Sequence, residues 1–386
     1  MDAAPTLGLY LHIPFCKHKC IYCDFYSLAG NEPRMEEYTN ALCAHLTATA
    51  PQAAGHTVDT VYFGGGTPSY LGVERLCRIL GVIFDRYTVS ADAEITFEAN
   101  PDSACDVNAL AALRKAGFNR ISLGMQSADD GELATIGRIH THTQTGAAVA
   151  AARAAGFDNL SLDLIYGLPQ QTMERWQANL AAAAELQPQH LSCYGLKVEE
   201  GTPLYARRDS VALPDDDAQA DFYLRTVEFL SAQGYEQYEV SNFSKAGHES
   251  RHNLKYWVLG EYLGFGPGAH SDFGGERFAW SRDLSAYIRG VQTGDIPLSE
   301  QEAVTPLQRE SEWLMLNLRT AGGIAPAAYE HRFDRSFAAY TPFLEQCRRA
   351  GYVLFENDRW HLTPHGFLLS NQIIGGLLGL LETQAE

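Results

Sequence analysis

Positive charge is scarce in this sequence. Its 386 residues include 29 Lys and Arg against 47 Asp and Glu, so the formal net charge is −18. A surface that binds nucleic acid needs clustered Lys and Arg, so the composition excludes broad nucleic-acid binding and leaves room only for a local basic patch. We therefore expect no nucleic-acid partner.

Signals for secretion and membrane insertion are also missing. Residues 1–15 lack the basic segment and the long apolar segment of a signal peptide. No run of about 18 apolar residues occurs, and the apolar stretch at 373–381 is too short and glycine-rich to span a bilayer. We expect a cytoplasmic protein with at most peripheral membrane contact. Its eight cysteines are then expected to be thiols, because the cytoplasm is reducing.

Three of these cysteines stand close together near the N-terminus. Cys16, Cys20 and Cys23 have the spacing C-x3-C-x2-C and follow a β-branched and aromatic segment. Three thiolates suit a [4Fe-4S] cluster with one iron open to an exogenous chelating group, because such clusters normally take four cysteines. Zinc is the rival interpretation, but only His18 lies at a suitable spacing to be a fourth zinc ligand. A purely structural set of thiols is the third interpretation.

Short β-rich segments alternate with Ala- and Leu-rich segments of helical period up to residue 232. The expected strands are 7–13, 58–63, 94–98, 120–124, 161–165 and 190–196, and the expected helices are 35–48, 72–86, 107–115, 144–155, 173–186 and 217–232. Repeated β-then-α units predict a parallel sheet, because parallel neighbours need a crossover connection. Six units fall short of the eight that close a barrel. We expect an α/β fold with a curved, incomplete (β/α)6 barrel.

Polar residues recur where the expected strands end. Gly64-Gly65-Gly66-Thr67-Pro68 follows the second strand, Glu98 ends the third, Gln126 follows the fourth and Asp163 lies in the fifth. Loops at the carboxyl ends of parallel barrel strands converge on a ligand. The cysteine segment follows the first strand, so we expect all of these residues at one site. Taken alone, the triple glycine is equally typical of a tight strand-to-helix turn.

These segments resemble a known family. C-x3-C-x2-C followed by an aromatic residue is similar to the radical S-adenosylmethionine (SAM) superfamily, where the amino and carboxylate groups of SAM chelate the open iron. The strings HIPFCKHKCIYCDFYS, YFGGGTPSYL, EITFEANP, RISLGMQS, LDLIYGLP and LPDDD closely resemble the HemW family of bacterial heme chaperones, relatives of the oxygen-independent coproporphyrinogen III oxidase. The similarity covers nearly the whole chain and also implies the incomplete barrel.

The resemblance implies a role for each matching residue. Cys16, Cys20 and Cys23 match the family's cluster ligands. The positions that match SAM contacts are Tyr10, Tyr22, Gly65, Gly66, Thr67, Glu98, Gln126, Arg138 and Asp163. Of these, Arg138 suits a carboxylate because its guanidinium donates as a fork. Taken singly, each charged or polar member is more often a solvated residue or a helix cap.

Two departures separate the chaperone from the oxidase. The oxidase pattern is similar to C-x3-C-x2-C-x-C, whereas Phe25 stands here at the fourth cysteine position. The resemblance also implies that the oxidase has a longer N-terminal arm, which covers its substrate. Only fifteen residues precede Cys16 here. Both departures favour the chaperone. The oxidase, which decarboxylates porphyrinogen propionates in heme biosynthesis, stays the alternative.

The segment Arg251-His252-Asn253-Leu254-Lys255-Tyr256-Trp257 resembles the H-N-x-x-Y-W signature of the chaperone group. A neutral imidazole is a good axial ligand for heme iron, so His252 is the candidate heme contact. Without the resemblance, a His beside a Trp is more often a core or hydrogen-bonding residue. His270 is a weaker second candidate.

The sequence predicts three parts. Residues 1–240 form the radical SAM barrel, 241–297 an extension that carries the H-N-x-x-Y-W motif, and 298–386 a C-terminal domain of the type shared with the oxidase. In that domain, helices at 302–319 and 343–350 and a hairpin of 352–356 with 359–362 predict a winged-helix-like fold. The expected cofactors are a [4Fe-4S] cluster, SAM and heme. The expected function is to bind heme and transfer it to an apo-hemoprotein such as a respiratory enzyme, and no catalytic residue is assigned.

Overall fold

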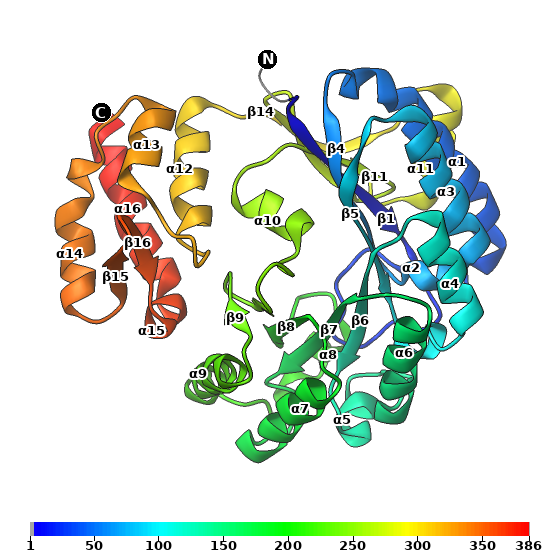
Figure 1. The fold of residues 1–386 in the computed structure, drawn as a ribbon, viewed down its shortest axis with the longest axis horizontal. Helices are drawn as coiled ribbons and strands as arrows, with labels where there is room; N and C mark the ends of the chain where they lie inside the picture. Colours follow the sequence, from blue (N-terminus) through cyan, green and yellow to red (C-terminus); the bar gives the residue numbers. More distant parts are fainter. Residues whose placement is uncertain (1–3, 386) are drawn as a thin grey trace.

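A parallel sheet forms the centre of the computed structural model, which describes residues 4–385 (Figure 1). Its successive neighbours are β1 (Thr6–Ile13), β4 (Thr57–Gly65), β5 (Val89–Ala99), β6 (Arg120–Gln126), β7 (Asn159–Tyr166) and β8 (His190–Gly195). Each strand pairs in parallel with the next. All six strands predicted from the sequence are confirmed, with ends that differ by a few residues.

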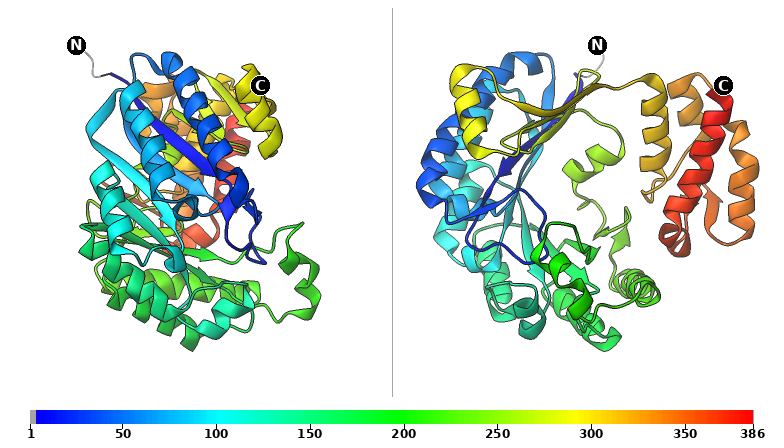
Figure 2. Two further views of the ribbon diagram at one scale, coloured as in Figure 1. Left: turned by 90° about the vertical axis from the view of Figure 1, so that its right-hand side faces the viewer. Right: turned by 180° about the vertical axis from the view of Figure 1, so that it is seen from behind.

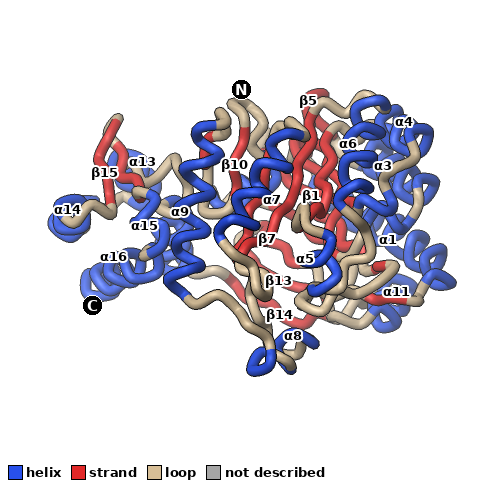
Figure 3. Tube along the Cα trace, turned by 90° about the horizontal axis from the view of Figure 1, so that it is seen from below, coloured by secondary structure: helices blue, strands red, loops and turns tan. Residues whose placement is uncertain are grey.

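Helices follow these strands and cover the outer face of the curved sheet, as Figures 2 and 3 show. The long ones are α1 (Met35–Thr49), α3 (Val73–Arg86), α4 (Val107–Ala116), α6 (His142–Ala154), α7 (Met173–Glu185) and α9 (Asp216–Ala232), and the short ones are α2 (Pro68–Leu71), α5 (Asp130–Thr135) and α8 (Pro203–Ala206). In α3, Leu76, Ile79, Leu80 and Ile83 recur at helical period and are all fully buried. Because they face one way, they pack against the sheet.

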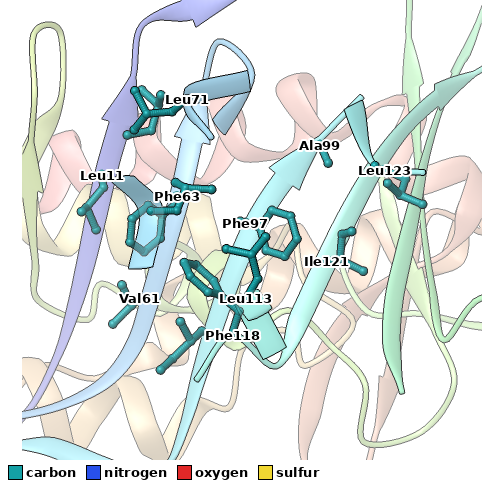
Figure 4. Close-up of a cluster of buried hydrophobic side chains, with 14 of the residues drawn as sticks. Leu11, Val61, Phe63, Leu71, Phe97, Ala99, Leu113, Phe118, Ile121 and Leu123 are labelled. Carbon is teal, nitrogen blue, oxygen red and sulfur yellow. The ribbon is translucent and has the colours of Figure 1, made fainter. Parts of the chain in front are cut away.

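The main core lies between the sheet and these helices. Alternate residues of β1, from Leu7 to Ile13, point into it and are fully buried. Figure 4 shows the neighbouring strands contributing in the same way, with Phe63, Phe97 and Ile121 in one apolar layer. The other face of each strand therefore points into the lumen of the barrel.

Further strands extend the sheet to twelve, and it stays open. One edge adds β10 (Asn242–Ser244) and β9 (Glu236–Gln237), and the other adds β11 (Tyr262–Phe265), β12 (His270–Phe273), β13 (Glu276–Trp280) and β14 (Leu298–Ala303), with α11 (Leu284–Thr293) before β14. Of these, β11 is parallel to β1 and the others are antiparallel. An extension of the barrel at 241–297 was predicted from the sequence, but the strands that form it were not. The fold is an incomplete barrel, as predicted.

The helix predicted from residue 302 begins later. Residues 302 and 303 belong to β14, where they pair with Arg277 and Glu276. Helix α12 (Pro306–Asn317) starts after Thr305, whose side chain caps it together with Gln308. The prediction was wrong at this end because a strand partner 25 residues away leaves no local signal.

A short helix fills part of the lumen. Helix α10 (Arg251–Trp257) lies inside the open barrel in Figure 1. The carboxylate of Glu94 on β5 accepts hydrogen bonds from the backbone N–H groups of Arg251 and His252, both at 3.1 Å. Lys255 places its Nζ 2.8 Å from Asp59 Oδ1. The H-N-x-x-Y-W segment is thus anchored to the strands of the barrel.

The C-terminal residues form most of a second hydrophobic cluster, built around Trp313, Tyr329, Tyr340 and Trp360. Its elements are α12, α13 (Pro326–Phe333), α14 (Thr341–Arg349), β15 (Val353–Glu356), β16 (Arg359–Leu362), α15 (Pro364–Leu368) and α16 (Ser370–Ala385). The predicted hairpin is present. Its two turn residues, Asn357 and Asp358, have φ of 51° and 59°, as a tight hairpin turn requires.

The predicted domain limits at residues 240 and 297 stay a prediction. Tyr223 of α9, which precedes the first limit, packs in the C-terminal cluster.

Two-residue strands β2 (Phe15–Cys16) and β3 (Leu28–Ala29) pair beside the cysteine loop. Among residues 4–385, no helix is long and apolar enough to cross a membrane.

Candidate cofactor-binding site

One cavity of about 490 Å³ opens at the carboxyl ends of the parallel strands. Cys16, Cys20 and Cys23 all line it, and all three are free thiols. Cys16 is 8% exposed, whereas the other two are half-buried. The segment that follows β1 therefore brings the three sulfurs to one wall of the cavity, as their spacing predicted.

The glycine segment after β4 holds this cysteine loop. Gly66 N–H donates to Ile13 O at 2.9 Å, and Thr67 N–H donates to Phe15 O at 2.8 Å. A Cβ on Gly66 would lie 2.8 Å from both the Ile13 and the Phe15 carbonyl oxygens. Gly65 has a φ of 107°, a backbone conformation that favours glycine. Two of the glycines are therefore required by close approach and by backbone geometry.

A continuous chain of hydrogen bonds links two of the cysteine sulfurs. Arg138 Nη1 donates to Cys20 Sγ at 3.6 Å, and its Nη2 donates to Asn100 Oδ1 at 2.6 Å. Asn100 Nδ2 donates to Thr67 Oγ1 at 3.1 Å, and Thr67 Oγ1 donates to Cys16 Sγ at 3.5 Å. Asn100 was not predicted as a site residue, although it belongs to the string EITFEANP. Its place two residues after Glu98, directly beyond the end of β5, was the available signal.

Two carboxylates, that of Glu98 on β5 and that of Asp163 on β7, line the same cavity. Glu98 accepts from Tyr62 Oη at 2.8 Å and from Gly65 N–H at 3.2 Å. Burial raises its pKa to about 7, although these hydrogen bonds oppose the rise. Asp163 accepts from Ser122 Oγ at 3.1 and 3.2 Å, and burial raises its pKa as well. Glu98 can therefore be protonated or paired with a ligand cation near neutral pH, and at Asp163 burial disfavours the charged form in the absence of a ligand.

The structure brings most of the predicted site residues to this cavity. Those that line it are Cys16, Cys20, Tyr22, Cys23, Gly65, Gly66, Thr67, Glu98, Gln126, Arg138 and Asp163. Gln126, the last residue of β6, has a φ of 62°, so the backbone leaves the extended conformation at this position. Tyr10 does not line the cavity. Its ring stacks on Tyr62 at a centroid distance of 6.3 Å, so it packs behind the lining.

His252 is also outside the lining. It is 1% exposed, its Nδ1 lies 2.9 Å from Thr60 Oγ1, and its Nε2 lies 2.8 Å from Tyr256 Oη. Burial lowers its pKa to about 3, so the ring is neutral. Both nitrogens are engaged, and a heme iron would have to displace one of these partners. Heme contact by His252 stays a prediction. Its neighbour Asn253 does line the cavity.

Other lining residues were not predicted. They come from β4, β6 and β8 and include Tyr62, Arg120, Ser122, Ser192 and Tyr194. Each points inward because strand residues alternate between the two faces of the sheet. Counting alternate positions back from Gln126 would have placed Arg120 and Ser122 in the lumen.

The cavity residues fit an iron–sulfur cluster. Within residues 4–385, no three His, Cys, Asp or Glu side chains lie close enough together to hold a single metal ion. In a [4Fe-4S] cube each thiolate binds a different iron, so the three sulfurs need to face one space and not one point. Three unpaired thiols that line a common cavity meet this requirement. Phe25 also lines the cavity and is 62% exposed.

Comparisons with known proteins agree with this geometry. The model of the Radical SAM superfamily matches residues 10–182, and that of the HemN C-terminal domain matches residues 304–369. The chain is 35% identical to the heme chaperone HemW of Bacillus subtilis, covering 96% of this chain and 99% of that protein. It is 37% identical to the heme chaperone HemW of Escherichia coli, covering 97% and 98%.

A solved structure is similar as well. The coproporphyrinogen III oxidase HemN from Escherichia coli, described as a radical SAM enzyme, superposes with a TM-score of 0.84 at 27% identity. The match covers 96% of this chain and 89% of that chain. The likeness extends over both the sheet and the C-terminal elements.

Proposed function

The chain belongs to the HemW family of the radical SAM superfamily, and from this membership we propose that it binds heme and transfers it to an apo-hemoprotein in the cytoplasm. The acceptor we propose is a respiratory enzyme. The observation that carries the proposal is the combination of near full-length similarity to heme chaperones with Phe25 at the wall of the cysteine cavity. A phenyl ring cannot supply the fourth thiol of the oxidase pattern.

The cavity residues support a [4Fe-4S] cluster and SAM as resident cofactors. Cys16, Cys20 and Cys23 would hold the cluster. Glu98, Gln126, Arg138 and Asp163, on or beside three different strands, would hold the polar groups of SAM. When bound, these groups supply one-electron chemistry. In a chaperone we propose that they act structurally or regulate the delivery of heme.

The protein's own residues prepare the cavity for these groups. Thr67 and Arg138 donate to the sulfurs of Cys16 and Cys20, which stabilises thiolate charge. Arg138 is held by Gly124 O at 2.7 Å and by Asn100, so its fork stays in place between the cysteine loop and β6. Glu98 and Asp163 offer carboxylate oxygens for amino or hydroxyl groups.

The alternative is oxidation of coproporphyrinogen III. The similarity to the Escherichia coli oxidase over 96% of this chain favours it, because the fold can host that chemistry. The two functions differ in one measurable respect. A chaperone takes up heme and forms no protoporphyrinogen, whereas the oxidase turns over coproporphyrinogen III with SAM.

The deciding experiment is anaerobic reconstitution of the full chain, followed by separate incubation with heme and with coproporphyrinogen III plus SAM and reductant. We expect about four irons per chain, a heme Soret band and no protoporphyrinogen IX. Cys20→Ala should lose the cluster, while Cys105→Ala, at an exposed thiol outside the cavity, should keep it. Sustained formation of protoporphyrinogen IX would favour the oxidase and contradict the chaperone.

A further inference from the structure

The buried side chain of Arg120 has no hydrogen-bond or ion-pair partner among the residues that the structure describes. Arg120 is 2% exposed and lines the cavity from the first position of β6. Within residues 4–385 its guanidinium makes no hydrogen bond and no ion pair, and its Nε is buried without an acceptor. Buried Arg residues are normally paired, because an unpaired buried charge costs several kcal/mol.

Glu94 and Asp163, whose negative charges act on Arg120, both accept hydrogen bonds from other donors. Glu94 accepts from the backbone N–H groups of Arg251 and His252. Asp163 accepts from Ser122. The negative charges of these carboxylates offset the positive charge of Arg120. Neither carboxylate accepts a hydrogen bond from the N–H donors of its guanidinium. The free donors therefore face the cavity.

Arg120 is well separated from the other cavity arginine. Arg138 is hydrogen-bonded to Gly124 O, beside the cysteine loop. Gly124 follows Arg120 by four residues along β6, which separates their Cα atoms by about 13 Å at the rise of a strand. A SAM carboxylate that also reaches the cluster belongs at the Arg138 end. The Arg120 end then remains for a different anionic group.

We propose that Arg120 binds a carboxylate of the cargo, one heme propionate, at the floor of the cavity. The inference rests on the proposed function and adds a binding residue to it. A guanidinium fork matches a carboxylate in two parallel hydrogen bonds. Asn253 lines the same cavity, and within residues 4–385 its side-chain amide has no hydrogen-bond partner, so it supplies a second free donor.

The test compares heme with heme dimethyl ester, which has the same ring and iron and no free carboxylate. Both are titrated anaerobically into the reconstituted full chain and followed at the Soret band. The parent should bind heme roughly ten- to a hundredfold more tightly than the ester. Arg120→Gln should lower heme affinity to that of the ester and leave ester affinity unchanged. Arg120→Lys keeps the charge without the fork and should fall between them.

Two controls limit the interpretation. Arg86→Gln, at an exposed arginine at the end of α3, should bind heme and ester as the parent does. SAM binding to Arg120→Gln should also equal that of the parent. If SAM binding is lost instead, Arg120 serves the cofactor and the inference is wrong.

The remaining outcomes are equally decisive. An unchanged heme-to-ester ratio in Arg120→Gln, or an equal loss for both ligands, would overturn the inference while leaving heme binding itself intact. If the Gln variant does not fold, the ratio in Arg120→Lys decides, and a ratio equal to that of the parent overturns the inference. If the parent binds no heme, the proposed function fails first and the inference fails with it.

Discussion

Glu98 illustrates how neighbours change the properties of a single residue. It lies inside the barrel, where it accepts from Tyr62 and from the glycine segment. Burial raises its pKa from 4.5 to about 7. The folded chain therefore holds a proton on Glu98 in a pH range where the unfolded chain has lost it. Folding stability must depend on pH through this group.

We predict that Glu98→Gln changes the pH dependence of stability in the cofactor-free protein. Because the folded pKa is raised, the parent loses stability as pH rises from about 4.5 through about 7. The full loss from Glu98 is about 3 kcal/mol. The variant lacks this loss, so its free energy of unfolding relative to the parent should rise between pH 5 and pH 8. Urea denaturation at both pH values measures it.

The matched control for Glu98 is Glu228→Gln on the surface of α9, beside Arg225. Its difference from the parent should stay within about 0.5 kcal/mol at both pH values. A pH-independent difference for Glu98→Gln would show that the carboxylate ionises normally in the folded protein.

Among the elements, the cysteine loop depends on its neighbour after β4. The loop has little regular structure of its own beyond the short pair of β2 and β3. Its position comes from backbone hydrogen bonds to Gly66 and Thr67. The glycine segment is thus a support for the cysteines as well as a candidate SAM contact.

We predict that Gly66→Ala weakens this support. The new methyl group would lie 2.8 Å from two backbone oxygens that cannot rotate away. We expect a loss of about 1–3 kcal/mol in unfolding free energy. The iron content after anaerobic reconstitution should also fall. Thermal or urea denaturation and iron analysis measure the two effects.

Gly81→Ala is the matched control. Gly81 lies within α3, and nothing stands within 4 Å of its added Cβ. This variant should gain about 0.5–1 kcal/mol, because alanine is the better helix former, and should keep its iron. Normal stability and iron content in Gly66→Ala would mean that the cysteine loop can shift without cost.

The position of helix α10 also depends on tertiary contacts. We predict that Lys255→Met lowers the free energy of unfolding by about 3 kcal/mol, because it leaves Asp59 without its ion-pair partner. Lys255 is 6% exposed and Asp59 is 19% exposed. Arg348→Met, which breaks an exposed pair with Glu345, should cost less than about 0.5 kcal/mol. Equal effects of the two substitutions would contradict a buried anchor for α10.

For the whole molecule, the contact between the sheet and the C-terminal elements is partly ionic. Arg309 of α12 donates from Nη1 and Nη2 to the two oxygens of Asp272 on β12, at 2.7 and 2.8 Å. Arg277 on β13 contacts Asp272 and Glu312. Backbone contact is also present, because Ala321 N–H donates to Tyr238 O at 2.9 Å.

We predict that Arg309→Gln loosens this contact while both hydrophobic clusters stay folded. The variant cannot form the paired hydrogen bonds to Asp272, so amide hydrogen exchange should accelerate in β12 and at the start of α12. Exchange in β4 to β7 should match that of the parent. Mass-spectrometric hydrogen exchange measures both regions, with Arg348→Gln as an exposed control on α14. Unchanged exchange in β12 would assign the contact to the apolar and backbone interactions.

The sequence by itself determined the local features. Short β-rich segments and helical period located the six parallel strands and their helices, since each pattern lies within about fifteen consecutive residues. The spacing of Cys16, Cys20 and Cys23 placed three sulfurs on one loop for the same reason. The turn at Asn357 and Asp358 was also readable, because turn chemistry belongs to adjacent residues.

Only the tertiary structure decided which distant residues meet. Arg138 reaches Cys20 across 118 positions, and His252 reaches Thr60 across 192. The sequence has no periodic signal for such contacts, because they depend on how strands and helices pack. Packing therefore enclosed His252 between two hydrogen-bond partners and left Arg120 without one among residues 4–385. It also placed residues 302 and 303 in β14, where the start of a helix was predicted.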